Sequence, residues 1–422
     1  MLENLSPQAP DALLALIKMY AADERHDKID LGVGVYRTGQ GDTPVFAAIK
    51  QAERKLVETQ DSKSYLGPEG DMGFVNGLMP YIFGGDATMG GRITGMQTPG
   101  GTGAVRLAVA LAQKAGVDRL HIGKPSWPNH AQIFNDISLE AQWFEHARAD
   151  GSANLEAVLD TINNAGPNDA VLLHGACHNP TGIDYSNEEW DAIAEAFATS
   201  GTFPIIDLAY QGLGHGMEED AYGLRKVLNA VPEAFIAYSC DKNFGVYRDR
   251  VGAFYAMTRD ADSLETVFSN ANALARAAWS MPPDHGGATI RLILRDPDMT
   301  AVWLDELTQM RDRMRQVRAS LGDAGMAGRV DFVPISKQNG LFSVLPVTPH
   351  QVNQLREEHG IYMAGSGRVN IAGLHMGNIE KFVNAVAAVT CFLSEYVVDH
   401  PKFLQNAIGL RLKKPEPDNP SR

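Results

Sequence analysis

Residues 170–208 read AVLLHGACHNPTGIDYSNEEWDAIAEAFATSGTFPIIDL. The apolar run at 170–175 predicts a strand, and apolar residues recur every three or four positions over 187–199, which predicts a helix. Ser186 begins a capping-box pattern, Ser-Asn-Glu-Glu, so the helix is expected to start there. Residues 203–208 are apolar again and predict a second strand. This order is typical of a strand–helix–strand unit with parallel strands.

The same alternation extends outward over about residues 93–257. It predicts further strands at 119–123, 234–238 and 251–257, and a helix at 104–115. We therefore expect an α/β fold in which helices flank a mostly parallel sheet. Ligands of such sheets bind beyond the carboxyl ends of the strands, so the residues that follow each strand are candidates for chemistry.

A second region follows the alternating one. A long amphipathic helix is predicted at 300–321, and residues 329–347 alternate as a strand does. Thr348 is expected to cap a further helix, and 368–372 predict another strand. These elements predict a smaller α+β domain. From Lys413 onward, the proline and charge content favours a flexible tail.

Composition excludes several classes of protein. The chain has 422 residues, with 44% hydrophobic and 21% charged residues, which is typical of a folded globular protein. Its net charge is 37 − 51 = −14, which disfavours binding to nucleic acid or anionic membranes. We find neither a signal-peptide pattern nor the roughly 18 uninterrupted apolar residues of a membrane span. The three cysteines form no Cys-x-x-Cys pair. We therefore predict a cytoplasmic protein without disulfides or structural zinc.

A glycine-rich turn joins a short apolar strand to a helix at residues 97–104, QTPGGTGA. Glycines let backbone N–H groups approach an anion closely, and a helix N-terminus adds its positive dipole end. A phosphate group would fit this turn, although a plain strand-to-helix turn without a ligand would have the same sequence. Neither this turn nor LGVGVY at 31–36 matches a dinucleotide-binding fingerprint, which argues against a dehydrogenase.

Polar residues follow three of the predicted strands: HGACHNPTG at 174–182, DLAYQG at 207–212 and SCDKNFG at 239–245. Each segment alone also fits a turn or a solvated ion pair. A metal site of two histidines and a cysteine in the first segment is disfavoured, because the i, i+3, i+4 spacing suits a helix. Together with a phosphate-binding turn, an aspartate, a tyrosine, an asparagine and a lysine at one sheet edge are what pyridoxal phosphate requires.

These motifs resemble those of the class I, fold type I pyridoxal-phosphate aminotransferases, the family of the aspartate and aromatic amino acid aminotransferases. The resemblance runs from about Leu13 to Val389. Residues 239–247, SCDKNFGVY, followed by DRVG at 249–252, match the family's lysine motif. The resemblance implies that Lys242 binds the cofactor covalently.

The same resemblance implies a role for each motif residue. Asp207 is expected to pair with the pyridine nitrogen, supported from behind by His130, while Tyr210 and Asn179 bind the phenolic oxygen of the ring. Trp127 is expected to stack on the cofactor. The phosphate ligands implied by the resemblance are Gly100, Gly101, Thr102, Ser239, Arg250 and, from the partner subunit of a homodimer, Tyr65.

Two arginines are implied as substrate ligands. Arg368, in GRVNIAG at 367–373, is expected to bind the α-carboxylate as a planar fork, together with Gly34, Trp127 and Asn179 around the substrate. Arg276 is expected to reach the distal carboxylate of a dicarboxylic substrate in the neighbouring subunit's site. A surface arginine on a helix would look the same in the sequence.

The resemblance implies a ping-pong transfer of an amino group between aspartate or an aromatic amino acid and 2-oxoglutarate, with Lys242, Asp207 and Tyr210 as catalytic residues. No metal is implied. The alternative is a catalytically silent binding protein of the same fold. Implied domain bounds are 1–43 for an N-terminal arm with part of the small domain, 44–309 for the large domain, 310–412 for the small domain and 413–422 for the tail.

The chain departs from the family at two motif positions. Asp241 stands directly before the lysine, where the family usually has a small hydroxyl residue. A buried carboxylate there would raise the pKa of the cofactor-linked nitrogen unless its side chain pointed away. Met281 stands where a polar residue is common. Both departures concern substrate tuning rather than the type of reaction.

Overall fold

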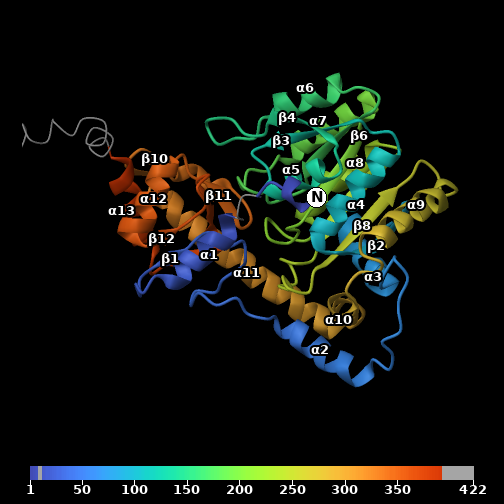
Figure 1. Cartoon of the computed structure of the whole chain (residues 1–422), viewed down its shortest axis with the longest axis horizontal. Helices are drawn as coiled ribbons and strands as arrows, with labels where there is room; N and C mark the ends of the chain where they lie inside the picture. The colour runs from blue at the N-terminus through green and yellow to red at the C-terminus, as the bar shows by residue number, and fades with distance from the viewer. Residues whose placement is uncertain (8–11, 392–422) are drawn as a thin grey trace, which may run out of the picture.

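A seven-stranded sheet forms the centre of the computed structural model, which describes residues 1–7 and 12–391 (Figure 1). Its strand order is β2-β8-β7-β6-β5-β3-β4. The one strand that runs against its neighbours is β8, which pairs antiparallel with both β2 and β7. The expected mostly parallel sheet is therefore confirmed. The strands are β2 (Ile93–Pro99), β3 (Arg119–Lys124), β4 (Glu140–Glu145), β5 (Asp169–His174), β6 (Phe203–Leu208), β7 (Ala234–Ser239) and β8 (Val251–Met257).

Helices cover both faces of this sheet because successive side chains of a strand point to opposite faces. On β5, Leu172 packs into one apolar cluster with residues of α4, α5 and α9, whereas Val171 and Leu173 pack into another with α6, α7 and α8. These helices are α4 (Gly100–Lys114), α5 (Pro128–Asp136), α6 (Leu155–Asn164), α7 (Asn187–Ser200), α8 (Tyr222–Ala230) and α9 (Ser263–Ala278).

The capping box predicted for α7 is confirmed. The Glu189 backbone N–H donates to the Ser186 hydroxyl at 3.2 Å, and the Glu189 carboxylate accepts from the Ser186 backbone N–H at 2.8 Å. Gly201 ends the helix in the left-handed conformation, which glycine adopts without strain. Both ends of α7 are thereby fixed, and the capping box at Ser186 defines where the segment that follows β5 enters the helix.

A third apolar cluster lies in a second unit, which includes segments from both ends of the chain (Figure 1). Strand β1 (Ile29–Asp30) pairs parallel with β12 (Ile361–Tyr362), and β11 (Phe342–Val344) pairs antiparallel with β13 (Arg368–Asn370). The long helix α11 (Pro297–Asp323) contributes to the first cluster near its start and to this one near its end. Further elements are α1 (Ala12–Ala22), α2 (Ala47–Thr59), α3 (Met72–Phe83), α10 (Asp284–Arg295), α12 (Pro349–His359), α13 (Ile379–Thr390), β9 (Met326–Ala327), β10 (Val330–Asp331) and the 3-10 turns η1 (Leu2–Asn4), η2 (Glu219–Ala221), η3 (Val333–Lys337) and η4 (Ile371–Gly373).

Two of the predicted strands in this unit were wrong in extent. Residues 329–347 form β10, η3 and β11 instead of one strand, because Pro334 lacks the N–H that a strand needs and favours the helical turn in which it lies. The strand expected at 368–372 ends at Asn370, whose side-chain oxygen accepts from the Ala372 backbone N–H and starts η4.

The division into domains at 43, 309 and 412 remains a proposal, which the separate third cluster supports. The predicted tail at 413–422 and the last part of 310–412 lie outside the described residues. Within the described ranges, no helix combines the length and apolar character that a membrane span needs. The same ranges contain no group of three or more histidine, cysteine, aspartate or glutamate side chains placed to hold a metal ion.

Candidate active site

The residues after β5, β6 and β7 meet at one edge of the sheet. His174 and Asp207 are register partners on β5 and β6, and Asp207 faces Ala237 on β7, two residues before Ser239. A cavity of about 200 Å³ lies beyond these strand ends. Its lining comprises Gly34, Gly101, Thr102, Trp127, His174, Asn179, Asp207, Ala209, Tyr210, Ser239, Asp241, Lys242, Tyr247 and Arg250. Most of the residues predicted to form a site are thus brought together.

One end of the cavity is built to accept an anion. Helix α4 begins at Gly100, which has a φ of +69° and is therefore at a position that favours glycine. A Cβ on Gly100 would lie 2.6 Å from Nη2 of Arg250, and one on Gly101 would lie 2.8 Å from Cβ of Ser239. Only glycines let the backbone of this turn approach Arg250 and Ser239 so closely. The hydroxyls of Thr102 and Ser239, the Arg250 guanidinium and the helix N-terminus together favour a phosphate group.

The Lys242 amine lies at the other side of the same cavity. Its side chain is 19% exposed, and its Nζ lies 4.0 Å from the Asp241 carboxylate and 5.2 Å from the centre of the Tyr210 ring. Desolvation lowers the pKa of Lys242, although the charges of Asp241 and Asp207 act in the opposite direction. A lowered pKa increases the fraction of neutral amine, which is the form that attacks a carbonyl carbon.

The Asp207 carboxylate stays charged although it is only 6% exposed. Burial by itself would raise its pKa, but a 3.1 Å hydrogen bond to Nε2 of His130, together with the charges of His130 and Lys242, outweighs burial and lowers it. Behind this pair, the Ser126 hydroxyl connects His130 with His174 at 2.9 and 3.1 Å. The predicted support of Asp207 by His130 is therefore present as a hydrogen bond.

Two further polar side chains point at one another beside Lys242. Nδ2 of Asn179 donates to the Tyr210 hydroxyl at 3.3 Å, while Oδ1 of Asn179 is buried and has no hydrogen-bond partner among the described residues. Burial raises the pKa of Tyr210, so its hydroxyl keeps its proton at neutral pH and is able to donate. An oxygen of a bound ring could accept from the Tyr210 hydroxyl and from Nδ2 of Asn179, whereas Oδ1 of Asn179 needs a hydrogen-bond donor.

Arg368 lies near this cavity without lining it. Its Nη2 donates to the Gly32 carbonyl at 2.9 Å, and its guanidinium lies 4.5 Å from the centre of the Phe342 ring. Its buried Nε has no hydrogen-bond partner in the described part of the chain. The stacked, partly unsatisfied guanidinium is suited to bind a carboxylate.

Arg276 and Tyr65 do not join the other predicted residues within this chain. Tyr65 is 95% exposed, and Arg276 lies on the exposed side of α9, where its Nη1 donates to the Ser280 hydroxyl at 2.6 Å. Neither residue lines the cavity. Their expected roles concern a neighbouring subunit, so these roles remain predictions.

Sequence reasoning missed several lining residues. His174 was considered only as a metal ligand, yet it lines the cavity, and burial lowers its pKa to about 3, so it is neutral at physiological pH. Behind it, the rings of His178 and His146 stack with centres 3.6 Å apart. Tyr247 also lines the cavity and accepts a hydrogen bond from the Tyr36 backbone N–H at 2.9 Å. The place of Tyr247 inside the lysine motif could have identified it.

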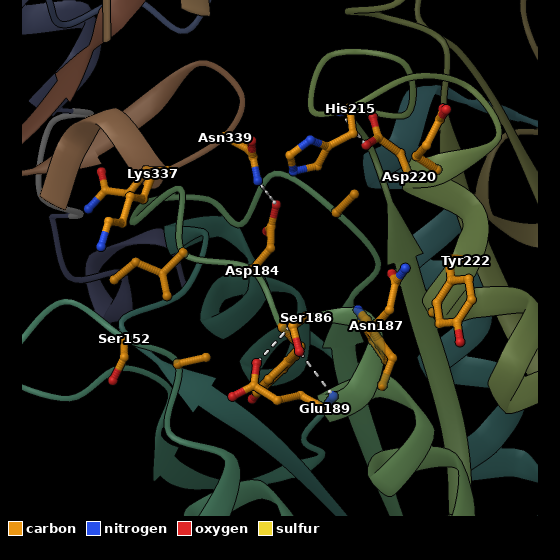
Figure 2. A pocket seen from close by; sticks show the side chains of 18 of the residues that line it. Ser152, Asp184, Ser186, Asn187, Glu189, His215, Asp220, Tyr222, Lys337 and Asn339 are labelled. Carbon is orange, nitrogen blue, oxygen red and sulfur yellow. Dashed lines mark hydrogen bonds between the residues drawn. The ribbon is translucent and has the colours of Figure 1, made fainter. Parts of the chain in front are cut away.

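A larger cavity, of about 780 Å³, lies between the start of α7, the η2 region and η3 (Figure 2). Three of its acidic side chains already have partners within the chain. Asp184 accepts from Asn339 at 3.1 Å, Glu189 caps α7, and Asp220 accepts from three backbone N–H groups. None of the predicted site residues lines it. The smaller cavity, where an amine, a carboxylate and an anion-binding end converge, is therefore the candidate active site.

The donors in the smaller cavity fit pyridoxal phosphate. The glycine turn with Thr102, Ser239 and Arg250 would hold the phosphate, and Asp207 would face the pyridine nitrogen. Lys242 supplies the amine that this cofactor requires. The orphaned Asn179 Oδ1 is a buried polar atom that needs a partner from a ligand or water.

Comparison with known proteins points to the same cofactor. Residues 26–386 match the family model described as aminotransferase class I and II. A tyrosine aminotransferase of Rhizobium meliloti is 47% identical over 375 residues, which cover 89% of this chain and 96% of that protein. The aspartate aminotransferase of Escherichia coli is 41% identical, over 92% of this chain and the whole of that protein. An aromatic-amino-acid aminotransferase from Burkholderia pseudomallei, solved covalently bound to pyridoxal phosphate, superposes with a TM-score of 0.88 at 33% identity, over 92% of this chain and 99% of that one.

Proposed function

Because the chain belongs to the class I and II aminotransferase family and is a pyridoxal-phosphate-dependent aminotransferase, we propose that it transfers amino groups between 2-oxoglutarate and either aspartate or an aromatic amino acid. The observation that carries this proposal is the partly buried Lys242 amine, which shares one cavity with Asp207 and an anion-binding end. The silent binding protein is not favoured, since the matched proteins are enzymes and Lys242 and Arg368 are both present.

Pyridoxal phosphate, when bound, supplies an aldehyde and a ring that accepts electrons from the substrate Cα. Lys242 would provide the amine that holds this aldehyde, and it would also act as the base that moves a proton at the substrate Cα. Asp207, which is itself held by His130, would place a negative charge against the ring nitrogen. Tyr210 and Asn179 would donate to the phenolic oxygen of the ring. Trp127 lines the cavity and would cover the ring.

The substrate range is tested by steady-state kinetics of the holoenzyme with 2-oxoglutarate as the amino acceptor. Aspartate, phenylalanine and tyrosine should be compared as donors. We expect turnover with at least one of these classes, because similar proteins include both aspartate and aromatic-amino-acid aminotransferases. Holoenzyme that contains pyridoxal phosphate but turns over neither class would contradict the proposal.

Arg368→Lys is expected to lower kcat/KM about a hundredfold for aspartate and aromatic substrates alike, because both have the α-carboxylate that the planar fork would bind. Steady-state kinetics on both substrates measure this effect. Arg356→Lys is the matched control, since Arg356 lies on α12 and contacts Glu357 at the surface. A loss confined to one substrate class would show that Arg368 does not bind the shared carboxylate.

We also propose a homodimer with shared active sites, in which Arg276 and Tyr65 act on the partner's site. The high exposure of Tyr65 and the position of Arg276 outside its own cavity support this arrangement. A cytoplasmic location is likewise proposed, because the chain has only three cysteines and no Cys-x-x-Cys pair.

Hybrid dimers test the shared site. Lys242→Ala and Arg276→Ala are each expected to be nearly inactive toward aspartate. If Arg276 acts across the interface, one of the two sites of a hybrid dimer has both wild-type residues. Statistical mixing should then restore about one quarter of wild-type activity. Activity no higher than the average of the two variants would show that Arg276 acts within its own chain.

A further inference from the structure

A buried carboxylate lies inside the anion-binding end of the cavity. Asp241 is 4% exposed and lines the cavity, and its Oδ2 would lie 3.3 Å from a Cβ on Gly100. The same Oδ2 accepts from Nη1 of Arg250 at 2.6 Å. The arginine expected to bind the phosphate is therefore already paired with a carboxylate of its own chain.

The contacts of Arg250 are divided between its two terminal nitrogens. Nη1 donates to Asp241 and also to the Tyr247 carbonyl at 2.9 Å. Nη2 faces the Gly100 turn. Asp241 thus holds the guanidinium so that Nη2 is directed toward the turn, while its negative charge cancels part of the positive charge there.

The carboxylate of Asp241 is itself only partly hydrogen-bonded. Its Oδ1 is buried and has no hydrogen-bond partner among the described residues, and the Lys242 amine lies 4.0 Å from its Oδ2. Two positive groups, Arg250 and Lys242, therefore balance one buried carboxylate. A phosphate dianion bound at the same turn would compete for this positive charge.

We propose that Asp241 weakens the hold of this site on the phosphate group of the cofactor, by neutralising Arg250 and repelling the dianion. This inference rests on the proposed role of the Gly100–Thr102 turn and Arg250 in phosphate binding. Its effect is greatest for the aminated form of the cofactor, which has no covalent bond to Lys242 and is held by non-covalent contacts alone. The aminated cofactor should accordingly leave the wild-type enzyme more readily than it leaves a variant without this charge.

Isothermal titration of the apoenzyme with inorganic phosphate isolates the anion-binding end from catalysis. Asp241→Asn keeps an oxygen that accepts from Arg250 but removes the charge, so phosphate affinity is expected to rise about tenfold. Asp241→Ser gives an independent variant without the carboxylate, for which the same direction is expected. The control is Asp249→Asn on the same loop, because Asp249 faces α10 and does not line the cavity. Unchanged or weaker phosphate binding in folded Asp241 variants would overturn the proposal.

A second titration tests whether Asp241 acts on the phosphate group of the cofactor rather than on its ring. Pyridoxamine phosphate should bind the Asp241 variants about tenfold more tightly than it binds the wild type, whereas pyridoxamine, which lacks the phosphate, should show no such gain. An equal gain for both ligands would place the effect of Asp241 elsewhere and reject the inference. Failure of the wild-type apoenzyme to bind pyridoxal phosphate would instead contradict the proposed site. Circular dichroism and thermal melting of each apoenzyme establish that the variants are folded.

Discussion

Lys242→Ala is expected to lower kcat by about 10⁴-fold or more, because the variant loses both the amine that holds the cofactor and the base that moves the substrate proton. Within the cavity, Lys242 is the amine that lies between Asp241 and the Tyr210 ring. Single-turnover kinetics with glutamate measure the loss. Borohydride reduction of wild-type holoenzyme, followed by peptide mapping, should place the cofactor on the peptide that contains residue 242.

Lys226→Ala is the matched control for Lys242→Ala. Lys226 lies on α8 at the surface, where it pairs with Asp191 at 2.9 Å. The control should keep wild-type turnover and cofactor content. Reduction that labels a lysine other than Lys242, or a Lys242→Ala variant that turns over at the wild-type rate, would contradict the assigned site.

Asp207→Asn is expected to lower kcat about 10³-fold, because an amide cannot supply the negative charge that stabilises a protonated ring nitrogen. The hydrogen bond from His130 and the surrounding positive charges lower the pKa of Asp207, so its carboxylate is charged throughout the neutral pH range. The side chains have nearly the same shape, so the loss reports charge rather than packing. Steady-state kcat at saturating pyridoxal phosphate is the measurement.

Asp169→Asn separates a catalytic loss from a loss of stability. Asp169 is also a buried carboxylate, but it lies at the opposite end of β5 and pairs with Arg119 and His121 at 3.1 and 2.8 Å. Its replacement should lower the melting temperature and leave kcat near the wild-type value. If Asp207→Asn instead melted earlier but kept its kcat, Asp207 would have only a structural role.

The strands of the sheet could be predicted because their hydrophobic patterns and the capping residues lie within short stretches of the sequence. The strands expected at 203–208 and 251–257 have those bounds in the structure, and the capping box at Ser186 starts α7 as expected. Parallel strands bring their carboxyl ends to one edge. The convergence of Asn179, Asp207 and Lys242 therefore followed from strand order as well as from the family resemblance.

Other features depended on segments that are distant in the sequence. The pairing of β1 with β12 joins residues 29–30 to 361–362, and no local pattern at either site specifies its partner. The stack of His146 on His178 likewise joins two loops, and the residues around each histidine do not indicate the other. The irregular path of 329–347, by contrast, has a local cause, because Pro334 interrupts an otherwise strand-like alternation.

By itself, the sequence determined the α/β architecture and the family, and it indicated the side chains proposed to carry the chemistry, because strand and helix patterns and motif spacing are encoded in neighbouring residues. Only the tertiary structure decided which of these side chains share a cavity and what surrounds each charge. Burial and the distance between charged groups depend on how separate segments pack together, and these two quantities set the pKa of Lys242 and pair Asp241 with Arg250.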